Sequence, residues 1–188
     1  MESQKNFSAP IPGNVSVDNH GTGLTLKYRW FSPKFIFLVF FCVFWDGFLI
    51  FWYTKALSTN APMMVILFPL IHVSVGIGLT YYTLAGFLNS TIVDVTRNGI
   101  TIYHTPLPWI GNKTIPVIDV VQLYREEIVS QSNNSLRIKY QLSAVSRENK
   151  KITVIGGIET AEVALFLEQE IEQWLGIKDV KVAGEMQK

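Results

Sequence analysis

Two long apolar stretches dominate the hydrophobic pattern of this chain. The first, residues 35–53, is nearly all Phe, Val, Ile, Leu and Trp. At about 1.5 Å of helix per residue, its length matches a bilayer hydrocarbon core of roughly 30 Å. The second, residues 61–88, contains no Asp, Glu, Lys or Arg and exceeds the required length. The pattern predicts two membrane-spanning helices, which the short connection at residues 54–60 joins into an antiparallel hairpin.

The charges beside these stretches predict their orientation. Cytosolic loops of membrane proteins carry an excess of Lys and Arg. Only Lys55 lies in the short connection, whereas basic residues flank the other ends of both stretches: Lys27, Arg29, Lys34, Arg97 and Lys113. We therefore expect a multi-pass protein of the inner (plasma) membrane with both termini in the cytosol.

Two ionisable polar side chains lie within the predicted spans. Residues equidistant from the loop of an antiparallel hairpin lie at equal depth, which places Asp46 opposite His72. A charged Asp near the centre of a span costs roughly 2.5 to 3.5 kcal/mol, so Asp46 should have a partner. The structural alternatives are a hydrogen bond that locks the hairpin or a water-accessible carboxylate, and the functional ones are a proton-sensitive pair or a contact to another membrane subunit. Pro69 should kink the second span and free a carbonyl group near His72.

Small residues in the second span allow another helix to approach closely. Ser74 and Gly78 are four residues apart, and Gly76 lies between them. Small residues at this spacing are typical of helix packing in membranes. They contact either the first span of the same chain or a helix of another chain.

The chain after the spans has the pattern of an antiparallel β domain. Strands are predicted at residues 91–96 and 99–104, joined at Asn98-Gly99, a strong hairpin signal that places Val95 opposite Ile102. Residues 135–144 alternate between apolar and polar side chains and predict a half-buried strand. Further strands are expected at residues 120–129 and 151–155.

The segment before the spans also contains extended stretches, at residues 15–17 and 24–30. A strand there would join the later sheet and make the spans an insertion in the β domain. The last element predicted is an amphipathic helix. Its apolar positions are Val163, Leu167, Ile171 and Trp174, its polar positions include Glu162, Glu168, Glu170 and Glu172, and it ends at Gly176.

These elements divide the chain into four parts. They are an N-terminal segment (residues 1–34), a transmembrane hairpin (35–88), a cytosolic domain (89–176) and a loosely ordered tail (177–188). The predicted fold class is a membrane α-helical hairpin plus an α+β soluble domain. About seven antiparallel strands, the Asn98-Gly99 hairpin and the final helix resemble the bacterial pleckstrin-homology-like membrane proteins. The resemblance covers roughly residues 24–176 and implies a PH-like β-barrel or sandwich, which is generally a binding or assembly module.

Surface residues of the β domain offer candidate contacts to lipids or partners. Arg147, Lys150 and Lys151 form either a basic edge for anionic headgroups or an ordinary solvated hairpin. Trp109 lies in an apolar loop that either reaches the membrane interface or a partner, or packs beneath the sheet.

Composition narrows the range of functions. The formal net charge is +1 with no basic cluster of nucleic-acid type, so nucleic acid is not an expected partner. The single cysteine, Cys42, excludes a disulfide within the chain, and the spacing of His and acidic residues predicts no catalytic, metal or cofactor site.

Two hypotheses for function follow from these patterns. The first is a non-enzymatic membrane-anchored binding or scaffold protein, whose partners are the lipid bilayer and another membrane protein or a second copy. The alternative is a small accessory or assembly subunit of a larger membrane complex.

Overall fold

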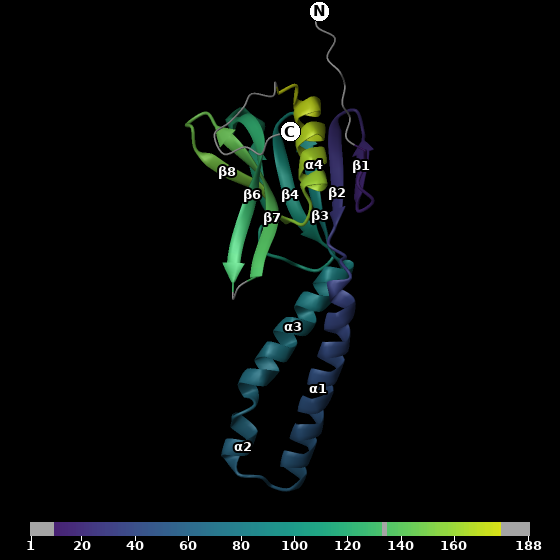
Figure 1. Ribbon diagram of the computed structural model, residues 1–188, viewed down its shortest axis with the longest axis vertical. Helices are drawn as coiled ribbons and strands as arrows, with labels where there is room; N and C mark the ends of the chain where they lie inside the picture. The colour runs from purple at the N-terminus through teal and green to yellow at the C-terminus, as the bar shows by residue number, and fades with distance from the viewer. Residues whose placement is uncertain (1–9, 133–134, 178–188) are drawn as a thin grey trace, which may run out of the picture. The chain divides into compact units, whose positions relative to one another are not determined.

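The computed structural model describes residues 10–132 and 135–177 (Figure 1). It divides the chain into two compact units. Trp30–Asn89 forms a helical unit, and the segments before and after it together form a β domain. The tail predicted at residues 177–188 lies outside the described residues, apart from Ile177.

The helical unit contains α1 (Lys34–Ser58), α2 (Met63–Leu67) and α3 (Leu70–Leu88). Lys34–Ser58 and Met63–Leu88 are both long and apolar enough to cross a membrane. Only 17% and 11% of their most apolar windows are buried inside the protein. The core helix of a soluble protein would be mostly buried, so these helices present their apolar surface outward.

Pro69 breaks the second apolar stretch into α2 and α3, where the sequence had predicted a single kinked helix. Proline has no N–H group, so the carbonyl of Val65 loses its partner four residues on. The indole Nε1 of Trp52 donates to that carbonyl at 3.3 Å, and the hydroxyl of Tyr53 donates to the carbonyl of Ile66 at 3.0 Å. Aromatic side chains of α1 therefore satisfy the backbone groups that the break exposes.

Glycines bring α1 and α3 into close contact. The ring of Phe35, which is 3% exposed, lies so close to Gly86 that a Cβ there would overlap it. Phe35 also packs at an angle against Tyr82 and Phe87. An aromatic cluster therefore joins the start of α1 to the end of α3, and this packing requires glycine at position 86.

The β domain contains two antiparallel sheets. The first has five strands in sequential order, and the second has three. The first sheet contains β1 (Val15–Asn19), β2 (Gly23–Arg29), β3 (Ser90–Thr96), β4 (Gly99–Thr105) and β5 (Lys113–Pro116). The second contains β6 (Val120–Ser132), β7 (Ser135–Ser146) and β8 (Lys151–Ile158).

Strands β2 and β3 are hydrogen-bonded neighbours although the helical unit separates them in the sequence. Their register pairs Arg29 with Ser90, the last and first residues of the two strands. The chain therefore leaves the sheet at Arg29 and re-enters it directly opposite. The two apolar helices are an insertion between adjacent strands of one sheet.

The predicted α+β class is confirmed, but of the two expected architectures, barrel or sandwich, a closed barrel is not formed, because the eight strands of the described residues make two separate sheets. Sequence reasoning missed the short strand β5. Pro116 ends this strand, and the 3-10 helix η1 (Val117–Asp119) follows before β6 begins. Proline cannot extend the ladder and the helical turn redirects the chain, so β6 starts a new sheet.

The register of the β3–β4 hairpin also differs from the prediction. Val95 pairs with Ile100 rather than Ile102, because the turn is centred one residue earlier than Asn98-Gly99. The hydroxyl of Thr96 accepts hydrogen bonds from the backbone N–H groups of Asn98 and Gly99, which fixes this turn. The partner shifts by two residues, so the same side chains still face the core.

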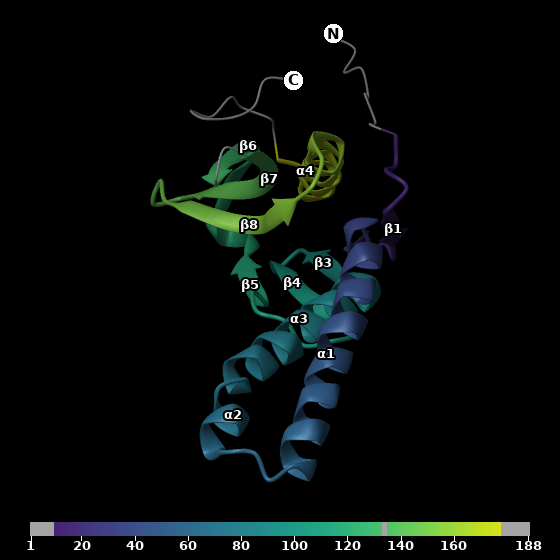
Figure 2. The same cartoon turned by 60° about the horizontal axis from the view of Figure 1, so that its bottom comes forward.

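Helix α4 (Ala161–Leu175) packs against β6, β7 and β8 of the second sheet (Figure 2). It also contacts β2 of the first sheet. Thr160 caps its start by accepting a hydrogen bond from the backbone N–H of Val163. Gly176 ends it in a left-handed conformation with φ 68°, as the sequence predicted. Large apolar side chains fill most of the core beneath it, with Leu26, Ile100, Leu123, Leu142, Phe166 and Ile171 at most 1% exposed.

Candidate functional site

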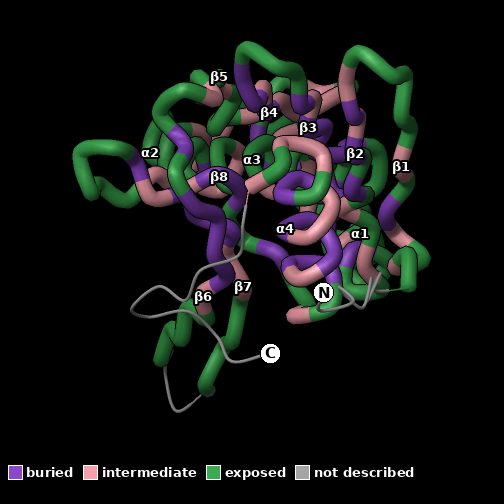
Figure 3. Tube along the Cα trace, turned by 90° about the horizontal axis from the view of Figure 1, so that it is seen from above, coloured by how far each residue is buried: buried purple, intermediate pink, exposed green. Residues whose placement is uncertain are grey.

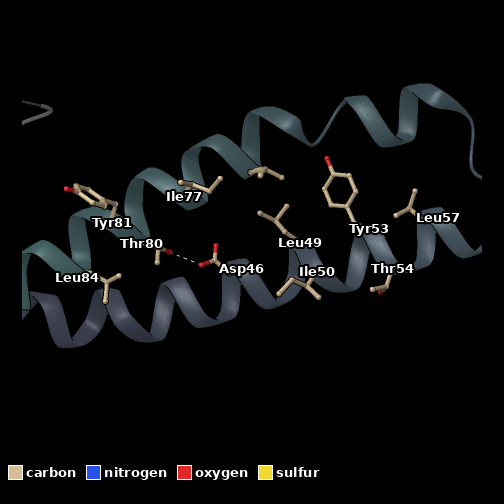
Figure 4. A pocket seen from close by; sticks show the side chains of 11 residues that line it. Asp46, Leu49, Ile50, Tyr53, Thr54, Leu57, Ile77, Thr80, Tyr81 and Leu84 are labelled. Atoms are coloured by element: carbon tan, nitrogen blue, oxygen red, sulfur yellow. Dashed lines mark hydrogen bonds between the residues drawn. The ribbon is translucent and has the colours of Figure 1, made fainter. Parts of the chain in front are cut away.

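A groove of about 640 Å³ lies between α1 and α3 of the helical unit (Figure 4). From α1, Leu49 and Tyr53 point into the space between the helices, and α3 contributes Ile77. Among the residues that line the groove, Asp46 is the only acidic or basic one. The groove is therefore an apolar surface with a single carboxylate at its floor.

The carboxylate of Asp46 is held by α3. The hydroxyl of Thr80 donates to its Oδ2 at 2.8 Å. Its Oδ1 lies over Gly76, where a Cβ would approach it to 2.8 Å, so a larger residue at position 76 would displace the carboxylate. Asp46 thus has a polar partner, as its position in an apolar helix requires, but the partner is Thr80.

The expected Asp46–His72 pair is not formed among the described residues. His72 instead stacks on Trp45, the neighbour of Asp46, with ring centroids 5.8 Å apart. The indole Nε1 of Trp45 also donates to the His72 carbonyl at 3.2 Å. Consecutive residues of a helix point about 100° apart, so Trp45 faces His72 while Asp46 faces the next turns of α3.

His72 itself is held by aromatic rings. Its ring stacks on Trp45 and also contacts Phe68 at a tilt, each at a centroid distance of 5.8 Å. Within the described chain its Nδ1 is buried and has no hydrogen-bond partner. The carbonyl that Pro69 was expected to free for His72 is instead satisfied by α1, as described above.

The three small residues of the second span have different surroundings. Gly76 is buried against Asp46 and Trp45 of α1, so it serves packing within the hairpin. Gly78 is exposed with open space around it, and Ser74 is exposed with its hydroxyl donating to the carbonyl of Leu70. Ser74 and Gly78 therefore remain available on the outer surface of α3.

Two of the three basic residues predicted for the β-domain edge are engaged in ion pairs. Lys150 contacts Glu148 at 2.7 Å, and Lys151 contacts Glu126 at 2.6 Å. Arg147 is exposed in the turn between β7 and β8. The carboxylates offset much of the positive charge, which weakens the case for this edge as a headgroup site.

Polar groups of the second sheet surround Glu126. Burial alone would raise its pKa, but hydrogen bonds from Lys151, Ser143 and Gln141 hold the pKa of Glu126 below its ordinary value. The bond to Glu126 in turn raises the pKa of Lys151. The group stays ionised and ties β6, β7 and β8 together, which is a structural role.

The loop that carries Trp109 is partly exposed. Trp109 is half-buried, whereas the following residue, Ile110, is 86% exposed. The Trp109 ring is therefore partly held by the domain, and the accessible apolar side chain of this loop is Ile110.

Sequence reasoning missed a buried ion pair between the second sheet and α4. Nε of Arg125 lies 2.6 Å from a carboxylate oxygen of Glu168, and these side chains are only 4% and 1% exposed. Nearby, Gln122 donates to Glu172 at 2.9 Å. The helical pattern had assigned both glutamates to the polar face, which assumed that this face meets solvent. Here it meets Arg125 and Gln122.

Within residues 10–132 and 135–177, no three His, Cys, Asp or Glu side chains are grouped so as to hold a metal ion. No family model matches the sequence, and no curated protein is significantly similar to it.

Proposed function

We propose that this chain is a non-enzymatic, membrane-anchored binding or scaffold protein. Its two apolar helices span the plasma membrane, and its PH-like β domain lies on the cytosolic side, where it contacts membrane proteins or lipid headgroups. The observation that carries the proposal is the insertion of both helices between the paired strands β2 and β3.

An insertion of this kind ties the domain to the bilayer at two adjacent points. Only residues 30–33 separate β2 from α1, and only Asn89 separates α3 from β3. Such short connections keep the domain at the membrane surface, where its effective concentration toward membrane-bound partners is high. This is the arrangement expected of a module that acts on partners in the same membrane.

Site-specific photocrosslinking in native membranes tests the proposal. A benzophenone amino acid at Ile110 reports on the apolar loop, and one at Ile118, which is 63% exposed on η1, is the matched control. We expect a defined adduct with one membrane protein or with lipid from position 110. Free monomer alone from both positions, in membranes that contain the intact chain, would argue against a binding role.

A second candidate function, a small assembly subunit of a larger membrane complex, is favoured by the groove at Asp46. A lone carboxylate in an apolar groove attracts a hydrogen-bond donor or cation on a neighbouring helix. Asp46→Asn should then lower the yield of the complex on native gels in mild detergent, whereas Ser58→Ala, at the exposed C-terminal end of α1, should not. Equal yields from the two variants would remove this candidate.

A further inference from the structure

The outer half of the β6–β7 hairpin extends beyond the core of the β domain. Figure 3 shows the distal ends of both strands as exposed. Val129 pairs with Ile138, and Gln131 pairs with Leu136. Val129, Leu136 and Ile138 are 55%, 70% and 49% exposed. The alternation of β7 was correctly predicted, but the expected burial of its apolar face fails over this half.

The exposed apolar face is a direct continuation of the core. Side chains two residues apart on a strand share one face, so Leu136 and Ile138 lie on the same face as Leu142, which is fully buried. Helix α4 covers the inner part of this face, and no described element covers the outer part. The hairpin therefore presents an uncovered strip of aliphatic side chains.

The opposite face of the same segment is basic. Lys139 pairs with Ile128, and Arg137 pairs with Ser130. Residues 128–139 contain these two cations and no Asp or Glu, which gives the segment a charge of +2. Aliphatic side chains combined with two cations complement the interface of an anionic bilayer.

The direction of the hairpin agrees with this chemistry. In Figure 1, β2 and β6 both run toward the lower end of the β domain, where β2 ends at Arg29. The chain enters the first apolar helix from this end and returns from the last one to Ser90. The hairpin thus points toward the end of the domain that continues into the membrane-spanning segment.

We propose that the outer half of the β6–β7 hairpin inserts into the headgroup region of the same anionic bilayer. Val129, Leu136 and Ile138 enter the interface, and Arg137 and Lys139 bind lipid phosphates. The inference rests on the proposed function and names its partner. Lipid is favoured over a second copy because the +2 segment of one copy would repel that of another at the same surface.

Environment-sensitive fluorescence of the full chain tests the inference. In a Cys42→Ala background, NBD is attached at Leu136→Cys near the tip, or at Arg147→Cys in the turn at the other end of β7. Each protein is placed as one copy per nanodisc, in phosphatidylcholine alone or with 30% phosphatidylglycerol. Quenching by doxyl-labelled lipid measures the fraction of label in the interface.

We expect position 136 to be quenched in the anionic discs and position 147 to remain in water. Replacing Arg137 and Lys139 by Gln should lower the inserted-to-free ratio by about fivefold per charge, or roughly 25-fold together. An unquenched label at 136, or quenching that requires two copies per disc, would overturn the inference. If crosslinking from Ile110 still succeeded, the proposed function would stand without it.

Discussion

The buried Arg125–Glu168 pair makes a strong prediction about the stability of the β domain. Both side chains are almost fully buried, and the pair joins β6 to α4 across the core. Removing one partner leaves the other charge in an apolar interior without compensation. Such a change destabilises a protein by about 3 to 5 kcal/mol. Arg125→Met and Glu168→Leu should each lower the free energy of unfolding by about this amount.

The double variant should be much less destabilised than the sum of the two changes. Two apolar side chains of similar volume leave no buried charge, and such replacements are often neutral or stabilising by about 1 to 4 kcal/mol. We expect the double variant to lie within about 2 kcal/mol of the natural chain, so the coupling energy should be at least about 4 kcal/mol. This non-additivity distinguishes a buried pair from two independent packing contacts.

Urea unfolding of the full chain in mild detergent, followed by near-ultraviolet circular dichroism, measures these free energies. The exposed Lys150–Glu148 pair is the matched control, with side chains 75% and 73% exposed. Breaking it with Lys150→Met should cost at most about 1 kcal/mol. Additive losses in the Arg125–Glu168 cycle, or single losses no larger than in the control, would refute the reasoning.

Three further predictions concern the hairpin and the pH dependence of the domain. Gly86→Leu should raise the alkylation rate of buried Cys42, because the new side chain meets an aromatic ring of α1, whereas Gly78→Leu, in open space, should leave it unchanged; equal rates would count against the packing described. Tyr53→Phe should also speed this alkylation, since it leaves a backbone carbonyl beside the Pro break without its donor at a cost of about 1 to 3 kcal/mol; an unchanged rate would show that the bond is dispensable. Burial, with a smaller contribution from Lys113, holds the pKa of His104 in the folded protein below its ordinary value of 6.5. The unfolded chain therefore binds the proton more readily, so the free energy of unfolding is highest above pH 6.5 and declines as the pH falls below it. His104→Asn should therefore flatten the urea midpoint between pH 7.5 and 5.5, and an unaltered slope would contradict this assignment.

Local patterns predicted most elements but not what covers them. The apolar stretches follow from the length of an unbroken apolar run, and the final helix follows from periodicity; both are local properties of the sequence. The polar face of α4 was assigned to solvent because periodicity cannot reveal a buried cation on another element. The same limitation applies to β7, because its alternation is identical whether the apolar face meets the core or extends past it.

The candidate site was predicted only in outline. Depth in an antiparallel hairpin follows from counting residues, and His72 does lie beside Trp45. Counting residues does not fix the rotation of each helix about its axis, so it could not reveal that Asp46 faces Thr80 rather than His72. A signal was present in the sequence, since Thr80 is four residues from Gly76 and small residues at this spacing mark a helix contact face.

We propose that both apolar helices cross the bilayer and leave the β domain in the cytosol. Labelling with a membrane-impermeant maleimide tests it directly in a Cys42→Ala background, with one new cysteine at Thr59 between the helices or at Lys150 in the β domain. We predict that intact cells label only Thr59→Cys and that Lys150→Cys reacts only after permeabilisation. Labelling of Lys150→Cys from outside, or recovery of the chain in the soluble fraction, would contradict the account.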